Sequence, residues 1–234
     1  METHKIASGS KILDYFLKGG YEDDIITTLY GPAGSGKTCL CLLATVNVTR
    51  KGKKVIYIDS EGGFSLERLK QIALDYKKVL DKTIFLKPTS FKEQKKVFLQ
   101  LKDIINNKIG LIVVDTISML YRLELGKNGE AQEANRELGK QLSYLSEIAR
   151  KKNIPILITN QVYASFDEKD KVNMVGGDLL KYGSKCLIEL QITPASNRRL
   201  ILKKHRSIEE EKEILFKIVD GGIIGTKESK FRLF

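Results

Sequence analysis

The sequence has little cysteine and no long apolar run, and both shortages exclude classes of protein. Among 234 residues there are three cysteines, Cys39, Cys41 and Cys186. An odd number of cysteines without metal-binding spacing favours reduced thiols over a disulfide framework. No stretch approaches the roughly 18 apolar residues of a membrane helix, and the opening METHKIASGS lacks the apolar centre of a signal peptide. We therefore expect a cytoplasmic protein without a membrane partner.

The chain also lacks an internal repeat, a low-complexity tract and a linker rich in proline or glycine. Its 42% hydrophobic and 29% charged residues are typical of a soluble protein. A chain of this length can bury a sizeable core. We expect a single domain over residues 1–234.

Acidic residues are in the minority, with 29 Asp and Glu against 40 Lys and Arg, which gives a formal net charge of +11. Such an excess favours a polyanionic partner such as DNA or RNA but says nothing of sequence-specific reading. Clusters such as residues 50–54 fall where a helix should end and a strand begin. A lysine-rich surface without a specific partner therefore explains the charge as well as nucleic acid does.

Apolar strands alternate with helices through the first two thirds of the chain. Strands are predicted at 24–30, 54–59, 83–88, 110–115 and 154–162, and helices over 8–20, 37–48, 65–76, 91–106 and 130–152. This alternation predicts an α/β fold with a mostly parallel sheet covered on both faces. The runs at 186–192, 198–206 and 213–219 are separated by turn residues, so antiparallel hairpins are expected to extend the sheet at its C-terminal end.

The stretch YGPAGSGKTCLC, which begins at Tyr30, contains the pattern G-x-x-x-x-G-K-[ST] between a predicted strand and a predicted helix, the context that a nucleotide phosphate loop requires. Glycines let backbone N–H groups turn inward around phosphate oxygens, and the following helix presents its positive end to them. Lys37 would neutralise the β- and γ-phosphates, and the Thr38 hydroxyl would ligate Mg²⁺. The alternative, a glycine-rich turn that fits by chance, is disfavoured by this context. The expected ATP-binding residues here are Gly31, Pro32, Ala33, Gly34, Ser35, Gly36, Lys37, Thr38 and Cys39.

Three polar side chains lie at or just after the ends of predicted strands and are expected at the same sheet edge as this loop. Asp115 ends LIVVD, where a carboxylate can hold the water shell of magnesium. Glu61, in YIDSEGGF, could orient or deprotonate the attacking water; alternatively it is a solvent-facing acid at a helix start. Gln161, in LITNQV, could contact the γ-phosphate and report its presence to the next loop; alternatively it is an ordinary polar strand end.

The motifs SGSKILDYFLKGG, YGPAGSGKT, YIDSEGGF, LIVVDTIS, LITNQV and GGDLLKYGSK, in this order, resemble those of the archaeal and eukaryal RecA-type recombinases, and most of all a short archaeal paralogue among them. The similarity covers about residues 6–225. It implies a RecA-like ATPase core in which Lys37, Thr38 and Asp115 hold Mg²⁺ and ATP, Glu61 is the catalytic glutamate and Gln161 the nucleotide sensor. Arg68, in SLERL, matches a position from which such proteins can place an arginine against the nucleotide base.

The resemblance also implies differences from the full-length recombinases. Those proteins carry an amino-terminal helix-hairpin-helix domain and a polymerisation linker, which we expect to be absent here because Met1 lies a few residues ahead of the core. Filament formation and strand exchange by this chain alone are therefore not expected. The implied role is an accessory protein of recombination and repair, with weak ATPase activity, that binds DNA and assists a RadA-type recombinase or other repair proteins. The alternative is a nucleotide-switched protein-interaction module without a direct DNA role.

The segments that match the DNA-facing loops of recombinases, 121–138 and 162–178, carry charges of both signs. A more cationic candidate is NRRLILKKHR, which contains Arg198, Arg199, Lys203, Lys204 and Arg206. If this strand alternates, Arg199 and Lys203 share one face and Arg198 and Lys204 the other. Contact with DNA phosphates and a solvated shield for an edge strand explain these cations equally well.

Overall fold

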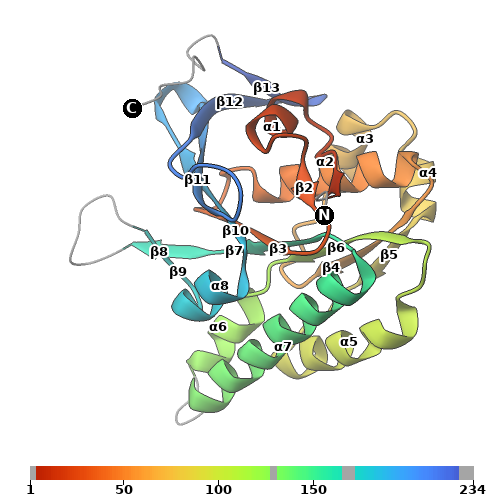
Figure 1. The fold of residues 1–234 in the computed structure, drawn as a ribbon, viewed down its shortest axis with the longest axis vertical. Helices are drawn as coiled ribbons and strands as arrows, with labels where there is room; N and C mark the ends of the chain where they lie inside the picture. Colours follow the sequence, from red (N-terminus) through yellow and green to blue (C-terminus); the bar gives the residue numbers. More distant parts are fainter. Residues whose placement is uncertain (1–3, 127–130, 165–171, 227–234) are drawn as a thin grey trace.

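A nine-stranded sheet runs through the middle of the molecule, with helices on both faces (Figure 1). The computed structural model describes residues 4–126, 131–164 and 172–226. The strand order is β13-β12-β11-β10-β3-β7-β6-β4-β5. Neighbouring strands from β10 to β5 pair in parallel, whereas β10, β11, β12 and β13 pair with each other antiparallel. The expected parallel sheet with an antiparallel C-terminal extension is confirmed.

The central strands are apolar because both of their faces are covered. They are β3 (Ile26–Tyr30), β4 (Lys54–Asp59), β5 (Thr83–Leu86), β6 (Ile109–Asp115), β7 (Ile156–Asn160) and β10 (Cys186–Ile192). The extension consists of β11 (Arg198–His205), β12 (Glu213–Val219) and β13 (Gly222–Gly225). Alternate residues of one strand enter different cores: Leu111 and Val113 of β6 pack into one, and Ile112 and Val114 into the other. This period of two is what a sheet between two helical layers requires.

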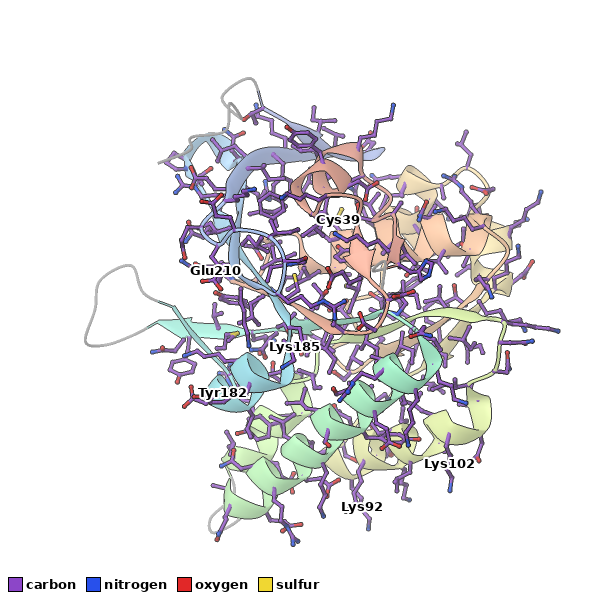
Figure 2. The ribbon with its side chains drawn as sticks, viewed as in Figure 1. Cys39, Lys92, Lys102, Tyr182, Lys185 and Glu210 are labelled. Carbon is purple, nitrogen blue, oxygen red and sulfur yellow. The ribbon has the colours of Figure 1, made fainter. Side chains whose placement is uncertain are left out.

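Each helical layer supplies one of these cores. The first layer holds α1 (Lys11–Phe16), α2 (Lys37–Arg50), α3 (Leu66–Ile72) and α4 (Tyr76–Asp81), and the second holds α5 (Phe91–Ile104), α6 (Met119–Leu125), α7 (Ala131–Lys152) and α8 (Gly177–Gly183). Helix α5 is amphipathic: Phe98 and Leu101 are buried, whereas Lys92 and Lys102 point outward (Figure 2). A 3-10 turn at Pro194–Ser196 links β10 to β11.

Two short hairpin-like pairs lie outside the main sheet. β1 (Lys5–Ile6) pairs with β2 (Tyr21–Glu22) around α1, and β8 (Val162–Ala164) pairs with β9 (Val172–Met174). Among the described residues, no helix is both long enough and apolar enough to cross a membrane.

Two helices differ from their predicted lengths. The helix predicted over 65–76 ends at Ile72, because Ala73 adopts an extended conformation (φ −138°, ψ 110°), and α4 starts anew at Tyr76. The first predicted helix is reduced to Lys11–Phe16. This helix starts after Ser10, whose side chain makes no capping hydrogen bond. The Asp14 carboxylate in its first turn instead accepts the Ser8 backbone N–H at 2.6 Å.

Candidate functional site

The phosphate loop lies between β3 and α2, as the sequence pattern predicted. Gly34 (φ 73°) and Gly36 (φ 106°) occupy left-handed conformations that favour glycine, and α2 begins at Lys37. The loop therefore leads directly into a helix N-terminus, where free N–H groups favour anions. The Ser35 hydroxyl inside the loop is buried and has no hydrogen-bond partner among the described residues.

Lys37 is folded back into the loop. Its Nζ donates hydrogen bonds to the carbonyl oxygens of Gly31 (2.8 Å) and Pro32 (2.9 Å). Burial lowers the pKa of Lys37, and the negative charges of Glu61 and Asp115 act in the opposite direction. The ammonium thus lies close enough to both carboxylates to interact with them electrostatically.

Asp115 ends β6 beside Thr38, with 2% of its surface exposed. The Thr159 hydroxyl donates to its Oδ1 at 2.5 Å, and the Tyr57 hydroxyl donates to its Oδ2 at 2.8 Å. These neutral donors fix the carboxylate without adding a cation, so its charge remains available. Sequence reasoning missed Tyr57 and Thr159; as polar residues on apolar strands that end at this edge, they could have been found.

Thr38 and Asp115 both approach Gly63. A Cβ atom added to Gly63 would lie 3.7 Å from Thr38 Oγ1 and 4.0 Å from Asp115 Oδ2, so both oxygens lie close to this glycine. A hydroxyl and a carboxylate are the oxygen ligands that Mg²⁺ prefers. Thr38 and Asp115 would hold the ion here.

Glu61 and Gln161 are 100 residues apart in sequence and in direct contact. Gln161 Nε2 donates a hydrogen bond of 3.0 Å to Glu61 Oε1. The Gln161 backbone N–H donates to the Ser118 hydroxyl at 3.2 Å, which ties the start of the segment after β7 to the segment after β6. The two side chains that the sequence placed at one sheet edge are therefore brought together.

Strand β10 and the antiparallel extension form a wall against the phosphate loop, which the sequence did not reveal. A Cβ atom on Gly31 would lie 2.2 Å from the Leu190 carbonyl oxygen of β10, and one on Gly36 would lie 3.2 Å from Ile218 Cδ1 of β12. At position 31 a side chain would collide with backbone, whereas at position 36 a small movement of the Ile218 side chain would make room. The neighbouring strand therefore requires glycine at position 31.

Arg68 lies on α3, and its guanidinium is bound to the β12–β13 turn. It donates to the carbonyl oxygens of Val219 (2.8 Å), Asp220 (3.3 Å) and Gly222 (3.1 Å). Its Nη2 also lies 3.3 Å from the Sγ of Cys39 on α2, whose position Figure 2 marks. The contacts of Arg68 anchor this turn beside the first turns of α2.

The cations of β11 and the residue after it are engaged with neighbouring groups. Lys203 Nζ lies 3.0 Å from Glu211, Arg199 lies 3.4 Å from Glu213, and Arg206 lies 2.5 Å from both Glu22 and Asp24. Lys204 Nζ donates to the carbonyl oxygens of Lys181 and Ser184, and Arg198 donates to those of Ser196 and Gly34.

The predicted alternation of these cations is wrong at Lys204. The register between β10 and β11 shifts between Leu187 and Ile188, so Lys204 pairs with Leu187 while Leu202 pairs with Ile188. The extra residue, Lys203, forms a bulge that turns Lys204 to the face opposite Leu202. Arg198 and Lys204 therefore do not share a face.

A cavity of about 700 Å³ lies between the two segments that match DNA-facing loops. Its lining includes Tyr121 and Arg122 of α6 and Tyr163 of β8; 52% of the Tyr163 surface is exposed. The remaining parts of these segments, 127–130 and 165–171, lie outside the described residues.

This geometry agrees with the comparisons to known proteins. The family model described as Rad51 matches residues 1–226. The DNA repair and recombination protein RadB of Methanobrevibacter smithii is 43% identical over 230 residues, which cover 95% of this chain and 97% of that protein. The chain belongs to the Rad51 family, in its RadB branch.

Other members support this placement. The RadB protein of Methanocaldococcus jannaschii is 42% identical over 217 residues, covering 91% of this chain and 98% of that one. A solved structure described as "Crystal structure of the RadB recombinase" superposes with a TM-score of 0.80 at 37% identity, covering 95% of this chain and all of that one. The RecA-like fold and the RadB resemblance predicted from the sequence are confirmed.

Proposed function

We propose that this RadB-branch protein is an ATP-binding and DNA-binding accessory protein of homologous recombination and repair, with weak ATPase activity and no strand exchange of its own. One observation carries the proposal: the contact between Gln161 and Glu61, whose charge also acts on Lys37 of the phosphate loop. It links a group that can act on ATP to the start of a segment that matches a DNA-facing loop.

The loop residues would bind the nucleotide by charge and by backbone donors. The N–H groups of the loop and of the first turn of α2 face the phosphates, and Lys37 exchanges its bonds to the Gly31 and Pro32 carbonyls for phosphate oxygens. Thr38 and Asp115 would hold Mg²⁺, which would supply positive charge against the phosphate oxygens. Ser35 supplies a further hydroxyl inside the loop.

Glu61 is the proposed general base for hydrolysis of ATP to ADP and phosphate. Its carboxylate is exposed at the sheet edge and can accept a proton from an attacking water or orient that water. Its Oε1, however, already accepts the Gln161 amide proton. A carboxylate with one oxygen engaged is a weaker base, so the proposed reason for slow turnover is that this contact must break before Glu61 can act.

Gln161 is the proposed sensor. If the γ-phosphate accepts a hydrogen bond from the Gln161 amide, the bond between Gln161 and Glu61 breaks. The movement of Gln161 then displaces Val162, the first residue of β8. Tyr163 follows and lines the cavity with Tyr121 and Arg122. The exposed ring of Tyr163, on a cavity that the Arg122 side chain also lines, is suited to stacking on the bases of single-stranded nucleic acid.

One experiment tests this linkage directly. The affinity of the purified protein for single-stranded DNA is measured without nucleotide, with Mg-ADP and with a non-hydrolysable Mg-ATP analogue. We expect the ATP analogue to change the affinity and ADP to leave it near the nucleotide-free value. Equal affinities in all three states would contradict the sensor role of Gln161.

A second candidate is the nucleotide-switched module whose partner is protein. The pairing of Arg199, Lys203 and Arg206 with carboxylates favours it, because paired cations offer less to DNA phosphates. DNA affinity against salt separates the two. A steep fall between 50 and 200 mM salt, as expected for about six phosphate contacts, supports DNA binding; no binding at low salt supports the protein partner.

Strand exchange by this family requires a filament on DNA, so filament formation is tested by electron microscopy with ATP and single-stranded DNA. We expect no continuous filaments at micromolar protein. ATP-dependent filaments would contradict the accessory role and favour a self-sufficient recombinase. Partnership with a RadA-type recombinase is tested by measuring strand exchange by that enzyme with and without this chain.

A further inference from the structure

The outer side of the phosphate loop carries a contact that the nucleotide chemistry above does not use. Arg198 Nη2 donates a hydrogen bond of 3.3 Å to the carbonyl oxygen of Gly34, and its Nη1 donates to the Ser196 carbonyl oxygen. Arg198 is the first residue of β11 and pairs with Ile192 of β10 and Phe216 of β12. The guanidinium is thus held between the β10–β11 turn and the loop.

The position of Arg198 in the wall makes this contact specific. Ile192 Cδ1, which pairs across from Arg198, comes within 4.0 Å of the Cβ position of Gly34. The turn itself is closed by the Thr193 N–H, which donates to the Asn197 carbonyl oxygen at 2.9 Å. A closed turn and a packed neighbour therefore direct the Arg198 side chain at the loop.

The charge of Arg198 is not neutralised by a carboxylate of the described residues. Arg199, Lys203 and Arg206 each pair with a carboxylate, whereas Arg198 bonds only to carbonyl oxygens. Its Nε is also buried without a hydrogen-bond partner in the described part of the chain. A full positive charge with spare donor capacity therefore lies beside the anion-binding loop.

The bond to Gly34 acts on the shape of the loop. Gly34 has a left-handed φ of 73°, and a carbonyl that is held outward by an external donor leaves the neighbouring N–H groups free to face inward. We propose that Arg198 is a positioning residue of the phosphate loop: it holds the loop through the Gly34 carbonyl, and its charge favours the phosphates of a bound nucleotide. This inference rests on the proposed ATP binding and assigns Arg198 to the nucleotide, not to DNA.

Charge-removing and charge-keeping variants of Arg198 test the proposal. Arg198→Gln keeps an N–H donor but loses the charge, and Arg198→Lys keeps the charge. Lys217→Gln, on an exposed position of the adjacent β12, is the control for loss of a nearby charge. Titration calorimetry measures the dissociation constants for Mg-ADP and for a non-hydrolysable Mg-ATP analogue, and thermal unfolding monitors stability.

We expect Arg198→Gln to weaken binding about tenfold, the size of effect that one charge-assisted hydrogen bond has on a dissociation constant. The loss should be larger for the ATP analogue than for ADP, because the former carries more negative charge, and Arg198→Lys should recover most of it. Wild-type affinity in Arg198→Gln, or an equal loss in Lys217→Gln, would overturn the inference. If the wild-type chain binds neither nucleotide, the proposed ATP binding itself is wrong, and the inference falls with it.

Discussion

The amide of Gln161 and the carboxylate of Glu61 are joined by a hydrogen bond of 3.0 Å, although they follow different strands of the sheet. The strands concerned, β7 and β4, lie on either side of β6, whose last residue is Asp115. The proposed base, the proposed sensor and a proposed metal ligand are therefore supplied by three neighbouring strands. The predictions below separate their roles.

Glu61→Gln should retain Mg-ATP binding and lose hydrolysis, because the amide is isosteric but cannot accept a proton from water. Single-turnover hydrolysis and nucleotide titration on the same preparation check this. Lys37→Ala is the complementary variant and should abolish Mg-ATP binding, since it removes the cation inside the loop. Normal hydrolysis by Glu61→Gln would disprove the assignment of Glu61.

Gln161→Ala should bind Mg-ATP about as well as wild type but lose the difference in DNA affinity between nucleotide states. The side chain that connects Glu61 to Val162 is removed, whereas the phosphate loop is untouched. DNA titrations with Mg-ADP and with the ATP analogue provide the measurement. A nucleotide effect of unchanged size in this variant would show that the signal travels by another route.

Gly63→Ala should fold normally and weaken Mg²⁺-dependent nucleotide binding. The added methyl group would contact Thr38 Oγ1 and Asp115 Oδ2 at ordinary distances, and it would crowd the two oxygens proposed to hold the ion. Gly139→Ala is a matched control. Gly139 lies on α7, where alanine favours the helix, and its added methyl group would meet the Leu179 side chain at a similar distance of 3.8 Å. Magnesium titration of nucleotide binding distinguishes the two; equal behaviour would contradict the proposed ion position.

Tyr163→Ala should weaken binding of single-stranded DNA by roughly 1–3 kcal/mol, the range for loss of one stacked base. Tyr182→Ala provides the control, because this tyrosine is also exposed but lies on α8, where Figure 2 marks it. Fluorescence anisotropy with a labelled oligonucleotide measures both. A loss common to both tyrosines would point to a general surface effect.

Folding stability should fall as the pH drops below about 6.5 because of His205. Burial lowers the pKa of this histidine from its ordinary value of 6.5, with Lys5, Arg206 and Lys18 acting in the same direction and Glu22 opposing them. The unfolded chain then binds more protons than the native one below pH 6.5, so stability is lost as the pH falls towards the lowered pKa.

The geometry around His205 supplies the reason and the control. Its Nδ1 accepts the Ser207 backbone N–H at 3.1 Å, and only 2% of the side chain is exposed, so protonation of Nδ1 would break a bond in a covered position. In His205→Asn, a side-chain oxygen can still accept this N–H without titrating. Denaturant unfolding between about pH 7 and pH 5 should show a smaller slope for the variant than for wild type. Equal slopes would disprove the role of His205.

The order of elements could be read from the sequence because strong local signals specify it. Short continuous apolar runs define β4 and β6, and glycines in left-handed conformations define the loop before α2. The edge at which parallel strands end then places Glu61 and Gln161 together. Local pattern and sheet topology suffice for this part of the site.

The remaining features depend on contacts between distant segments. The bulge that turns Lys204 is a property of the pairing between β10 and β11, and the break at Ala73 interrupts an otherwise helical pattern. The ion pairs of Arg199 and Lys203 likewise join β11 to carboxylates that follow it in the chain. The sequence therefore suggested cations free to bind DNA, whereas these two are paired within the protein. No single segment of sequence contains that information.

The wall behind the phosphate loop changes how its first glycine is understood. The Leu190 carbonyl oxygen lies only 2.2 Å from the position that the Cβ of any other residue at position 31 would take. An alanine there would collide with the backbone of an adjacent strand before any nucleotide arrived, and its cost would be seen in the yield of folded protein. In this chain, the first glycine of the phosphate-binding motif is therefore also needed for close packing against β10.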